Sequence, residues 1–316
     1  MDDERRIYEI LEAARKKQKR YGAFALACFS YHVLYVLWVV LLADKFFLGD
    51  DSVFLFQIII TLIGGFACMP IFVLMIYFLI RYAKAYKEYE NDYKRLIARP
   101  VLESMFDNAQ YYPDKGYTQE EFKGMHLIYW RNGFNYRSED LIRGTHKGLD
   151  FSRADIRITH RNDNNIVVDI DGRLMEFPFS KNINSRILIV KNRGRVLVEA
   201  GLNEVIMEDM DFNQKFTVYA EDAHSVFYLL TPRFMEYVKS LYNKDDAIYI
   251  SFDRGRLYFL ESGHGGIFET PQKKLDEHVD IRREIEKSKA ELEEIGEIIE
   301  ILQLDKAGEM EKMINA

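Results

Sequence analysis

Ala23–Ala43 reads AFALACFSYHVLYVLWVVLLA, and Val53–Ile80 reads VFLFQIIITLIGGFACMPIFVLMIYFLI. Neither stretch contains an Asp, Glu, Lys or Arg. A helix needs about 20 apolar residues to cross a bilayer, so both stretches are long enough. The short connector between them carries three Asp and one Lys. The sequence therefore predicts a two-helix transmembrane hairpin over residues 23–80, with spans at 23–43 and 53–80.

Basic residues are concentrated on the outer flanks of these two spans. The sequence RKKQKR at residues 15–20 precedes the first span, and six Lys or Arg residues between positions 81 and 99 follow the second. Basic residues close to a span remain preferentially on the cytoplasmic side. We therefore expect a two-pass protein of the cell membrane, with both termini in the cytoplasm and the lipid bilayer as its first partner.

A few residues inside the spans are not simple apolar side chains. His32 lies in the first span, where a polar group can relay protons or bind a ligand, or can simply bond a neighbouring helix. Gly64, Gly65 and Pro70 in the second span predict a packing notch or a mild kink rather than a transport path.

The composition limits the classes to which this chain can belong. Of its 316 residues 48% are hydrophobic and 29% are charged, which excludes a disordered chain and argues against a many-helix transporter. The net charge is −7, and residues 101–316 alone carry −10, so no nucleic-acid partner is expected. Cys28 and Cys68 both lie in the spans, so the rest of the chain can form neither a disulfide nor a cysteine zinc site.

The remaining sequence divides into segments around the hairpin. Residues 1–22 predict a basic cytoplasmic helix, and residues 81–110 predict a juxtamembrane helix that breaks near Pro100. Residues 111–270 predict a soluble cytoplasmic domain, and residues 271–316 a coiled-coil-like helix and tail. The juxtamembrane helix carries a tyrosine stripe that is either an interfacial belt or a packing seam: Tyr82, Tyr86, Tyr89 and Tyr93.

Short stretches of alternating pattern predict that the soluble domain is α+β, with a mostly antiparallel sheet. Asp171-Gly172 is a hairpin-turn signal between strands at Ile166–Ile170 and Leu174–Phe179. Further strands are expected at 155–159, 186–190, 195–200, 204–207, 216–220, 226–230, 247–252 and 256–261.

Two helices and an aromatic core are expected in the same domain. Thr118 and Glu121 predict a capping box for a helix over residues 119–129, and Thr231 with Pro232 predicts the start of a helix that runs to about Tyr242. The aromatic residues expected in the core are Trp130, Phe151, Phe216, Tyr219, Phe227, Phe234 and Phe252.

A charged helix is predicted over residues 272–303. Its seam positions recur at alternating intervals of four and three, which is the heptad spacing of a coiled coil: Ile281, Ile285, Ser288, Leu292, Ile295, Ile299 and Leu302. The apolar seam needs a cover. The cover is either the same helix of another copy, or the tyrosine stripe or basic N-terminal helix of the same chain, which opposite charge favours slightly.

No motif assigns a reaction to the chain. The seven histidines form no metal-binding pair, and no phosphate-binding glycine loop or nucleophile elbow occurs. The acidic run around Asp163, Asp169 and Asp171 fits turns better than a calcium loop, and Gly263–Gly266 fits a flexible loop better than an anion cradle. The catalytic residues therefore remain unknown, and no cofactor or metal site is expected.

Residues 212–242, FNQKFTVYAEDAHSVFYLLTPRFMEYVKSLY, carry a resemblance to a known family. Phe212, Phe216, Val218-Tyr219, Asp222, Leu230-Thr231-Pro232 and Phe234-Met235-Glu236 resemble the signature of the bacterial "domain of unknown function 3137" membrane proteins. The resemblance spans about residues 110–270 together with the hairpin, and the C-terminal heptad helix departs from it. It implies a bacterial plasma or inner membrane, and it transfers no catalytic residue because the matching positions are packing and capping residues.

Three functions fit these observations to different degrees. The favoured one is a membrane-anchored cytoplasmic binding or scaffolding module, with a membrane-associated protein partner or self-association. The alternatives are an enzyme acting at the inner leaflet and a subunit of an oligomeric channel or transporter. The almost purely apolar spans argue against the last.

Overall fold

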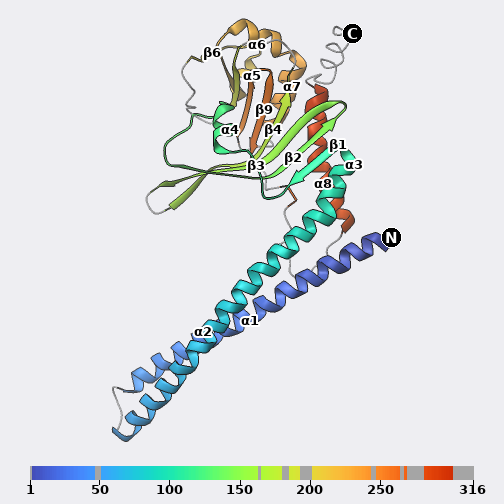
Figure 1. Ribbon diagram of the computed structural model, residues 1–316. Helices are drawn as coiled ribbons and strands as arrows, with labels where there is room; N and C mark the ends of the chain where they lie inside the picture. Colours follow the sequence, from blue (N-terminus) through green and yellow to red (C-terminus); the bar gives the residue numbers. More distant parts are fainter. Residues whose placement is uncertain are drawn as a thin grey trace. The chain divides into compact units, whose positions relative to one another are not determined.

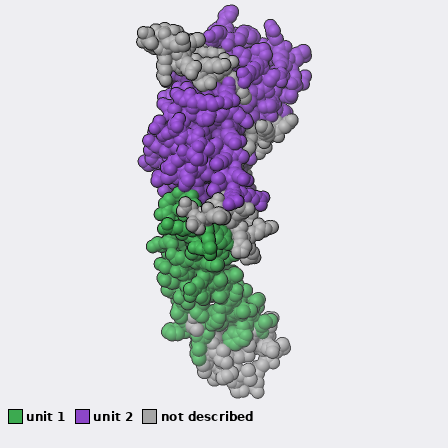
Figure 2. Space-filling view, turned by 90° about the vertical axis from the view of Figure 1, so that its right-hand side faces the viewer, with its two compact units in different colours: residues 1–96, 270–281 green, residues 97–269, 282–316 purple. Residues whose placement is uncertain are grey.

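A computed structural model describes residues 2–46, 51–162, 165–179, 185–192, 201–242, 247–263, 267–268 and 281–301. The chain forms two compact units, which are coloured separately in Figure 2. Unit 1 consists of residues 1–96 with 270–281, and unit 2 consists of residues 97–269 with 282–316. The predicted strand at 195–200 and residues His264 and His278 lie outside the described residues.

Unit 1 is built on two long helices, α1 (Asp2–Phe46) and α2 (Asp51–Tyr93). The predicted basic N-terminal helix and the first apolar stretch thus form one continuous helix. Both α1 and α2 are long and apolar enough to cross a membrane, which agrees with the predicted pair of apolar helices. The tyrosine stripe is split, because Tyr82 is exposed whereas Tyr89 and Tyr93 are buried.

Contacts along α1 and α2 explain the polar and small residues in their sequences. The Tyr35 ring packs over Gly64, where an added Cβ would lie 2.6 Å from a ring carbon, so Gly64 forms the predicted notch. His32 Nδ1 lies 2.8 Å from the carbonyl oxygen of Cys28, and Nε2 lies 3.1 Å from that of Cys68. His32 therefore bridges the two helices through their backbones.

Unit 2 is an α+β fold around one antiparallel sheet, with strand order β1-β2-β3-β4-β9-β8-β5-β7-β6 among the described residues (Figure 1). The strands are β1 (Asp107–Tyr112), β2 (Phe134–His146), β3 (Leu149–Asn162), β4 (Asn165–Pro178), β5 (Ile187–Lys191), β6 (Asn203–Val205), β7 (Phe216–Ala220), β8 (Ile248–Asp253) and β9 (Arg256–Ser262).

Helical segments surround this sheet. A π-helical turn, η1 (Lys94–Ala98), leads into α3 (Arg99–Met105), and Pro100 lies in the first turn of α3. At the break predicted near Pro100 the helix therefore changes from π-helical to α-helical geometry. The other helices are α4 (Gln119–Gly124), α5 (Met210–Lys215), α6 (Ala223–Leu229), α7 (Pro232–Leu241) and α8 (Ile281–Ile301).

Several local predictions are confirmed by the element boundaries. Thr118 and Glu121 form the capping box of α4, which is shorter than expected, and the Thr231 hydroxyl caps α7. β8 and β9 form the predicted hairpin, and β7 coincides with the predicted strand. Four of the expected aromatic core residues are buried, namely Phe151, Phe216, Phe234 and Phe252, whereas Trp130 and Tyr219 are half-buried.

The prediction of a hairpin turn at Asp171-Gly172 is wrong. Both residues lie within the continuous strand β4, which pairs with β3 on one side and with β9 on the other. Glycine is needed here for close approach rather than for a turn, since an added Cβ would lie 1.8 Å from the carbonyl oxygen of Glu261. The β3–β4 pairing continues to Asn162 opposite Asn165.

The predicted strand at 226–230 is also wrong, because this segment forms α6. The Asp222 carboxylate accepts hydrogen bonds from the backbone N–H groups of His224 and Ser225 and starts the helix. Val226, Leu229 and Leu230 are buried at helical spacing. Phe227 faces outward and is 52% exposed, so its expected place in the core is incorrect.

The seam of α8 is buried within unit 2 of the same chain. Ser288, Leu292, Ile295, Ile298 and Ile299 are buried, and four of these five are predicted seam positions. The described contacts of α8 include a salt bridge from Glu294 to Arg173 of β4 and an ion pair between Glu300 and Lys147. The sheet, which the heptad spacing did not suggest as a partner, thus covers this seam.

Candidate ligand pocket

Five polar or aromatic residues form a row across five neighbouring strands of unit 2. The strand register places Gln110 opposite Arg143, Arg143 opposite Ser152, Ser152 opposite Glu176, and Glu176 opposite Tyr258. Directly opposite residues in antiparallel strands project from the same face, with Cβ atoms about 5 Å apart. The register alone therefore brings five residues from distant parts of the sequence to one face of the sheet.

The same face continues into an apolar area that is covered by the α4 region. Ala154 and Ile156 follow Ser152 at two-residue intervals, so their side chains project from the same face as Ser152. They belong to a buried cluster that includes Phe122 and Met125 from α4 and its C-terminal end. Because α4 covers only the apolar area, the polar row remains open to solvent.

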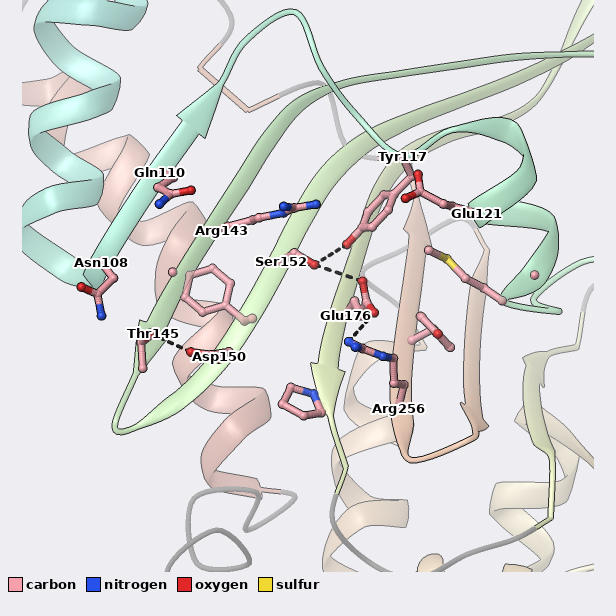
Figure 3. Close-up of a pocket in the computed structure, with 16 residues that line it drawn as sticks. Asn108, Gln110, Tyr117, Glu121, Arg143, Thr145, Asp150, Ser152, Glu176 and Arg256 are labelled. Atoms are coloured by element: carbon pink, nitrogen blue, oxygen red, sulfur yellow. Dashed lines mark hydrogen bonds and ion pairs between the residues drawn. The ribbon is translucent and has the colours of Figure 1, made fainter.

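This open area is a pocket of about 770 Å³, which is within the usual range for small-molecule sites (Figure 3). The polar row forms its floor, and the α4 region forms one wall. The remaining lining residues come from the ends of β1 to β4, from β9 and from the α4 region: Asn108, Tyr117, Glu121, Gly124, Met125, Gly144, Thr145, Asp150, Phe151, Pro178 and Arg256.

A chain of hydrogen bonds connects the middle of the pocket. The Tyr117 and Ser152 hydroxyl oxygens lie 2.7 Å apart, and the Ser152 hydroxyl donates to Glu176 Oε2 at 3.1 Å. Arg256 donates to the other carboxylate oxygen, Glu176 Oε1, at 2.7 Å. Since the Ser152 proton is directed at Glu176, Tyr117 is the donor in its bond to Ser152. Figure 3 shows the resulting series from Tyr117 to Arg256.

Burial keeps the two tyrosines of the pocket in their neutral form. Burial, reinforced by the negative charge of Glu176, raises the pKa of Tyr117 well above its usual value of 10.0. The same two causes raise the pKa of Tyr258 to about 12. Tyr117 is therefore a hydrogen-bond donor at neutral pH and does not act as a base.

The arrangement is better suited to binding than to bond cleavage. Among the described residues, the lining contains no histidine, cysteine or lysine that could activate Ser152 or act as a nucleophile. The Ser152 hydroxyl is directed at a carboxylate that is already paired with Arg256. Nor does any group of three or more His, Cys, Asp or Glu side chains in the described ranges have the geometry to hold a metal ion.

The histidines that the structure describes lie outside this pocket. His160 bonds Asp169 at 2.6 Å on the β3–β4 ribbon, and His146 packs against Phe106. His32 lies in α1 of unit 1, whereas His146 and His160 belong to unit 2.

Sequence reasoning missed the pocket because it missed β1 and β2. Arg143 and Gln110 lie on strands that were not predicted, and Ser152 was considered only as a nucleophile. Polar residues at two-residue intervals, such as Asp150 with Ser152, could have indicated a polar sheet face. The partners across the sheet could not be identified without the strand order.

A family model matches part of this chain. The model described as "Protein of unknown function (DUF3137)" matches residues 169–304. Over this region the chain is similar to the DUF3137 family. The predicted resemblance is thus confirmed, although the DUF3137 match begins later than expected and includes α8, which had been expected to depart from the family. The match contains Glu176, Arg256 and Tyr258 of the pocket but neither Arg143 nor Ser152.

Comparisons with curated proteins and solved structures add little to the DUF3137 match. No curated protein matches the chain. One similar solved structure is the crystal structure of the mycobacterial trehalose monomycolate transport factor A, TtfA. It is 8% identical, with a TM-score of 0.32, and the alignment covers 60% of this chain and 90% of that one.

Proposed function

We propose that this protein is a membrane-anchored binding or scaffolding module of the bacterial plasma or inner membrane. In this proposal α1 and α2 span the bilayer as a hairpin, and unit 2 lies in the cytoplasm and binds a ligand or a membrane-associated partner. Anchoring would raise the effective concentration of unit 2 toward other membrane components without any additional contact.

The exposed apolar surface of the two long helices carries the anchoring part of the proposal. Leu26, Leu34 and Leu41 of α1 are 64–66% exposed, and Phe66 and Met69 of α2 are 85% and 71% exposed. Single exposed leucines are common in soluble proteins, but a continuous apolar surface of this length is typical of a membrane or protein interface. The basic residues at both outer flanks support the cytoplasmic placement of the termini.

The pocket supports binding over catalysis. Its central hydroxyls and carboxylate are engaged with one another, and Tyr117 is held neutral, so these groups can recognise a ligand but are poorly prepared to transfer a proton. An inner-leaflet enzyme would need a general base or nucleophile that the described lining does not supply.

Extraction of membranes at alkaline pH tests the anchoring. We expect the full chain to remain in the membrane pellet and a chain that begins at Ile97 to be released into the supernatant. Release of the full chain would overturn the anchor.

Purification of the full chain from native membranes tests the binding role. A binding module should retain a stoichiometric ligand or partner, whereas an enzyme should instead turn over a membrane component.

A further inference from the structure

The polar groups that line the pocket fall into two sets, those with partners and those without. All three carboxylates have partners: Glu176 is bonded by Ser152 and Arg256, Asp150 accepts a hydrogen bond from the Thr145 hydroxyl, and Glu121 accepts one from the backbone N–H of Thr118. The carboxylates of the pocket are therefore engaged with the protein itself.

Two hydrogen-bond donors of the lining that keep free N–H groups within the described part of the chain lie on neighbouring strands, Arg143 on β2 and Gln110 on β1. Arg143 makes no hydrogen bond or ion pair within the described part of the chain, and its side chain points into the pocket over β3 (Figure 3). Its cross-strand neighbour Gln110 uses its amide oxygen to accept from the Tyr112 hydroxyl, which leaves the amide NH₂ group available. Asn108 adds a second side-chain amide on the same strand.

The position of Arg143 separates it from Glu176 but leaves Asp150 closer. Its direct neighbours in the row are Gln110 and Ser152, both neutral, and Glu176 lies two strands away, at roughly 10 Å between strand axes. Asp150 is diagonal to Arg143 across β2 and β3, which places it nearer than Glu176. A guanidinium whose directly opposite neighbours are neutral, with further donors beside it, suits an oxyanion, which guanidinium binds through paired hydrogen bonds.

We propose that this pocket binds an organic anion whose carboxylate or phosphate group is held by Arg143, with the amides of Gln110 and Asn108 as additional donors. The proposal rests on the proposed binding function and names its ligand class. The rest of the ligand lies over the row toward Ser152 and Tyr258, where hydroxyl and aromatic groups form the floor. The anionic group belongs either to a soluble metabolite or to a lipid headgroup.

The test is the thermal unfolding midpoint of the full chain in a nonionic detergent, with inorganic phosphate, acetate or short-chain dihexanoyl phosphatidic acid added separately. Choline and the uncharged dihexanoyl glycerol are the control ligands. We expect at least one anion to raise the midpoint in a saturable manner, and neither control to do so. A response to phosphate or acetate indicates a soluble source, and a response to the phosphatidic acid alone indicates a lipid.

Three variants connect this binding to the pocket. Arg143→Gln should weaken the apparent affinity about tenfold or more, because charge-assisted hydrogen bonds are lost. Asp150→Asn should strengthen it, because a nearby negative charge is removed. Arg137→Gln is the matched control, since Arg137 lies on the same strand outside the pocket and pairs with Glu139. Its affinity should equal that of the wild type.

The proposal is overturned if no anion raises the midpoint, if the control ligands raise it equally, or if Arg143→Gln responds as the wild type does. If Arg143→Gln does not fold, the Asp150→Asn result decides, and unchanged affinity in that variant counts against the proposal. None of these failures affects the alkaline-extraction result, so a wrong ligand class can be distinguished from a wrong anchoring function.

Discussion

Substituting Asp for Ile295 places a charge where α8 packs onto the sheet. Ile295 is 1% exposed, and it lies beside Glu294, which forms a salt bridge with Arg173 at 2.5 Å. Arg173 also bonds the fully buried Glu261. The new carboxylate would thus enter an apolar contact that already adjoins a network of two acids and one base.

The expected cost follows from two losses. Removing a buried Ile side chain costs about 2–5 kcal/mol, because it removes apolar contacts and leaves a cavity. The carboxyl group then either remains charged without a partner or takes up a proton, and each unit by which its pKa rises costs about 1.4 kcal/mol. A total of about 4 kcal/mol or more is expected, which is a large part of the 5–15 kcal/mol that stabilises a typical domain.

Urea unfolding of the full chain in detergent measures this cost. Trp130 fluorescence reports on unit 2 in a Trp38→Phe background. Ala290→Asp is the matched control, because it adds the same acid to the same helix at an exposed position and should cost less than about 1 kcal/mol. If Ile295→Asp were as stable as Ala290→Asp, the packing of the α8 seam within unit 2 would be refuted.

Three further substitutions test the interior of unit 2. Phe234→Ala should lower the free energy of unfolding by about 3–5 kcal/mol, because the ring is buried and only 2% exposed. Urea titration measures this loss. Gly172→Ala should cost about 3 kcal/mol, since its Cβ would meet the Glu261 carbonyl, and an unchanged midpoint would contradict the register of β4 with β9. Burial raises the pKa of Asp155 from 3.8 to about 6, so this carboxyl favours the folded state below pH 3.8, and that advantage is lost as the pH rises through 6. Between pH 4 and 7 the wild type should therefore lose about 2 kcal/mol of stability relative to Asp155→Asn, and parallel pH profiles would count against the assignment.

The features that the sequence predicted correctly depend on neighbouring residues. The two apolar stretches need only length and composition, and the caps at Thr118 and Thr231 need only residues within one helical turn. The β8–β9 hairpin likewise closes over a few residues. Such features can be recognised because the interactions that determine them lie close together in the sequence.

The features that it failed to predict depend on distant partners. Asp171-Gly172 resembles a turn until β9, some 90 residues later, is known to lie against Gly172. The α8 seam has the spacing of a coiled coil, yet a sheet covers it. The pocket depends on the register of five strands, so Arg143 and Glu176 acquire a common role only through the fold.

The most direct test of the anchored arrangement is cysteine labelling in intact cells with a membrane-impermeant maleimide. In a Cys28→Ala, Cys68→Ala background, Asp50→Cys tests the connector, and Met210→Cys tests unit 2, where Met210 is 75% exposed. We expect Asp50→Cys to be labelled in intact cells, and Met210→Cys to be labelled only after the cells are permeabilised. Labelling of Met210→Cys but not of Asp50→Cys in intact cells would contradict the cytoplasmic placement of unit 2.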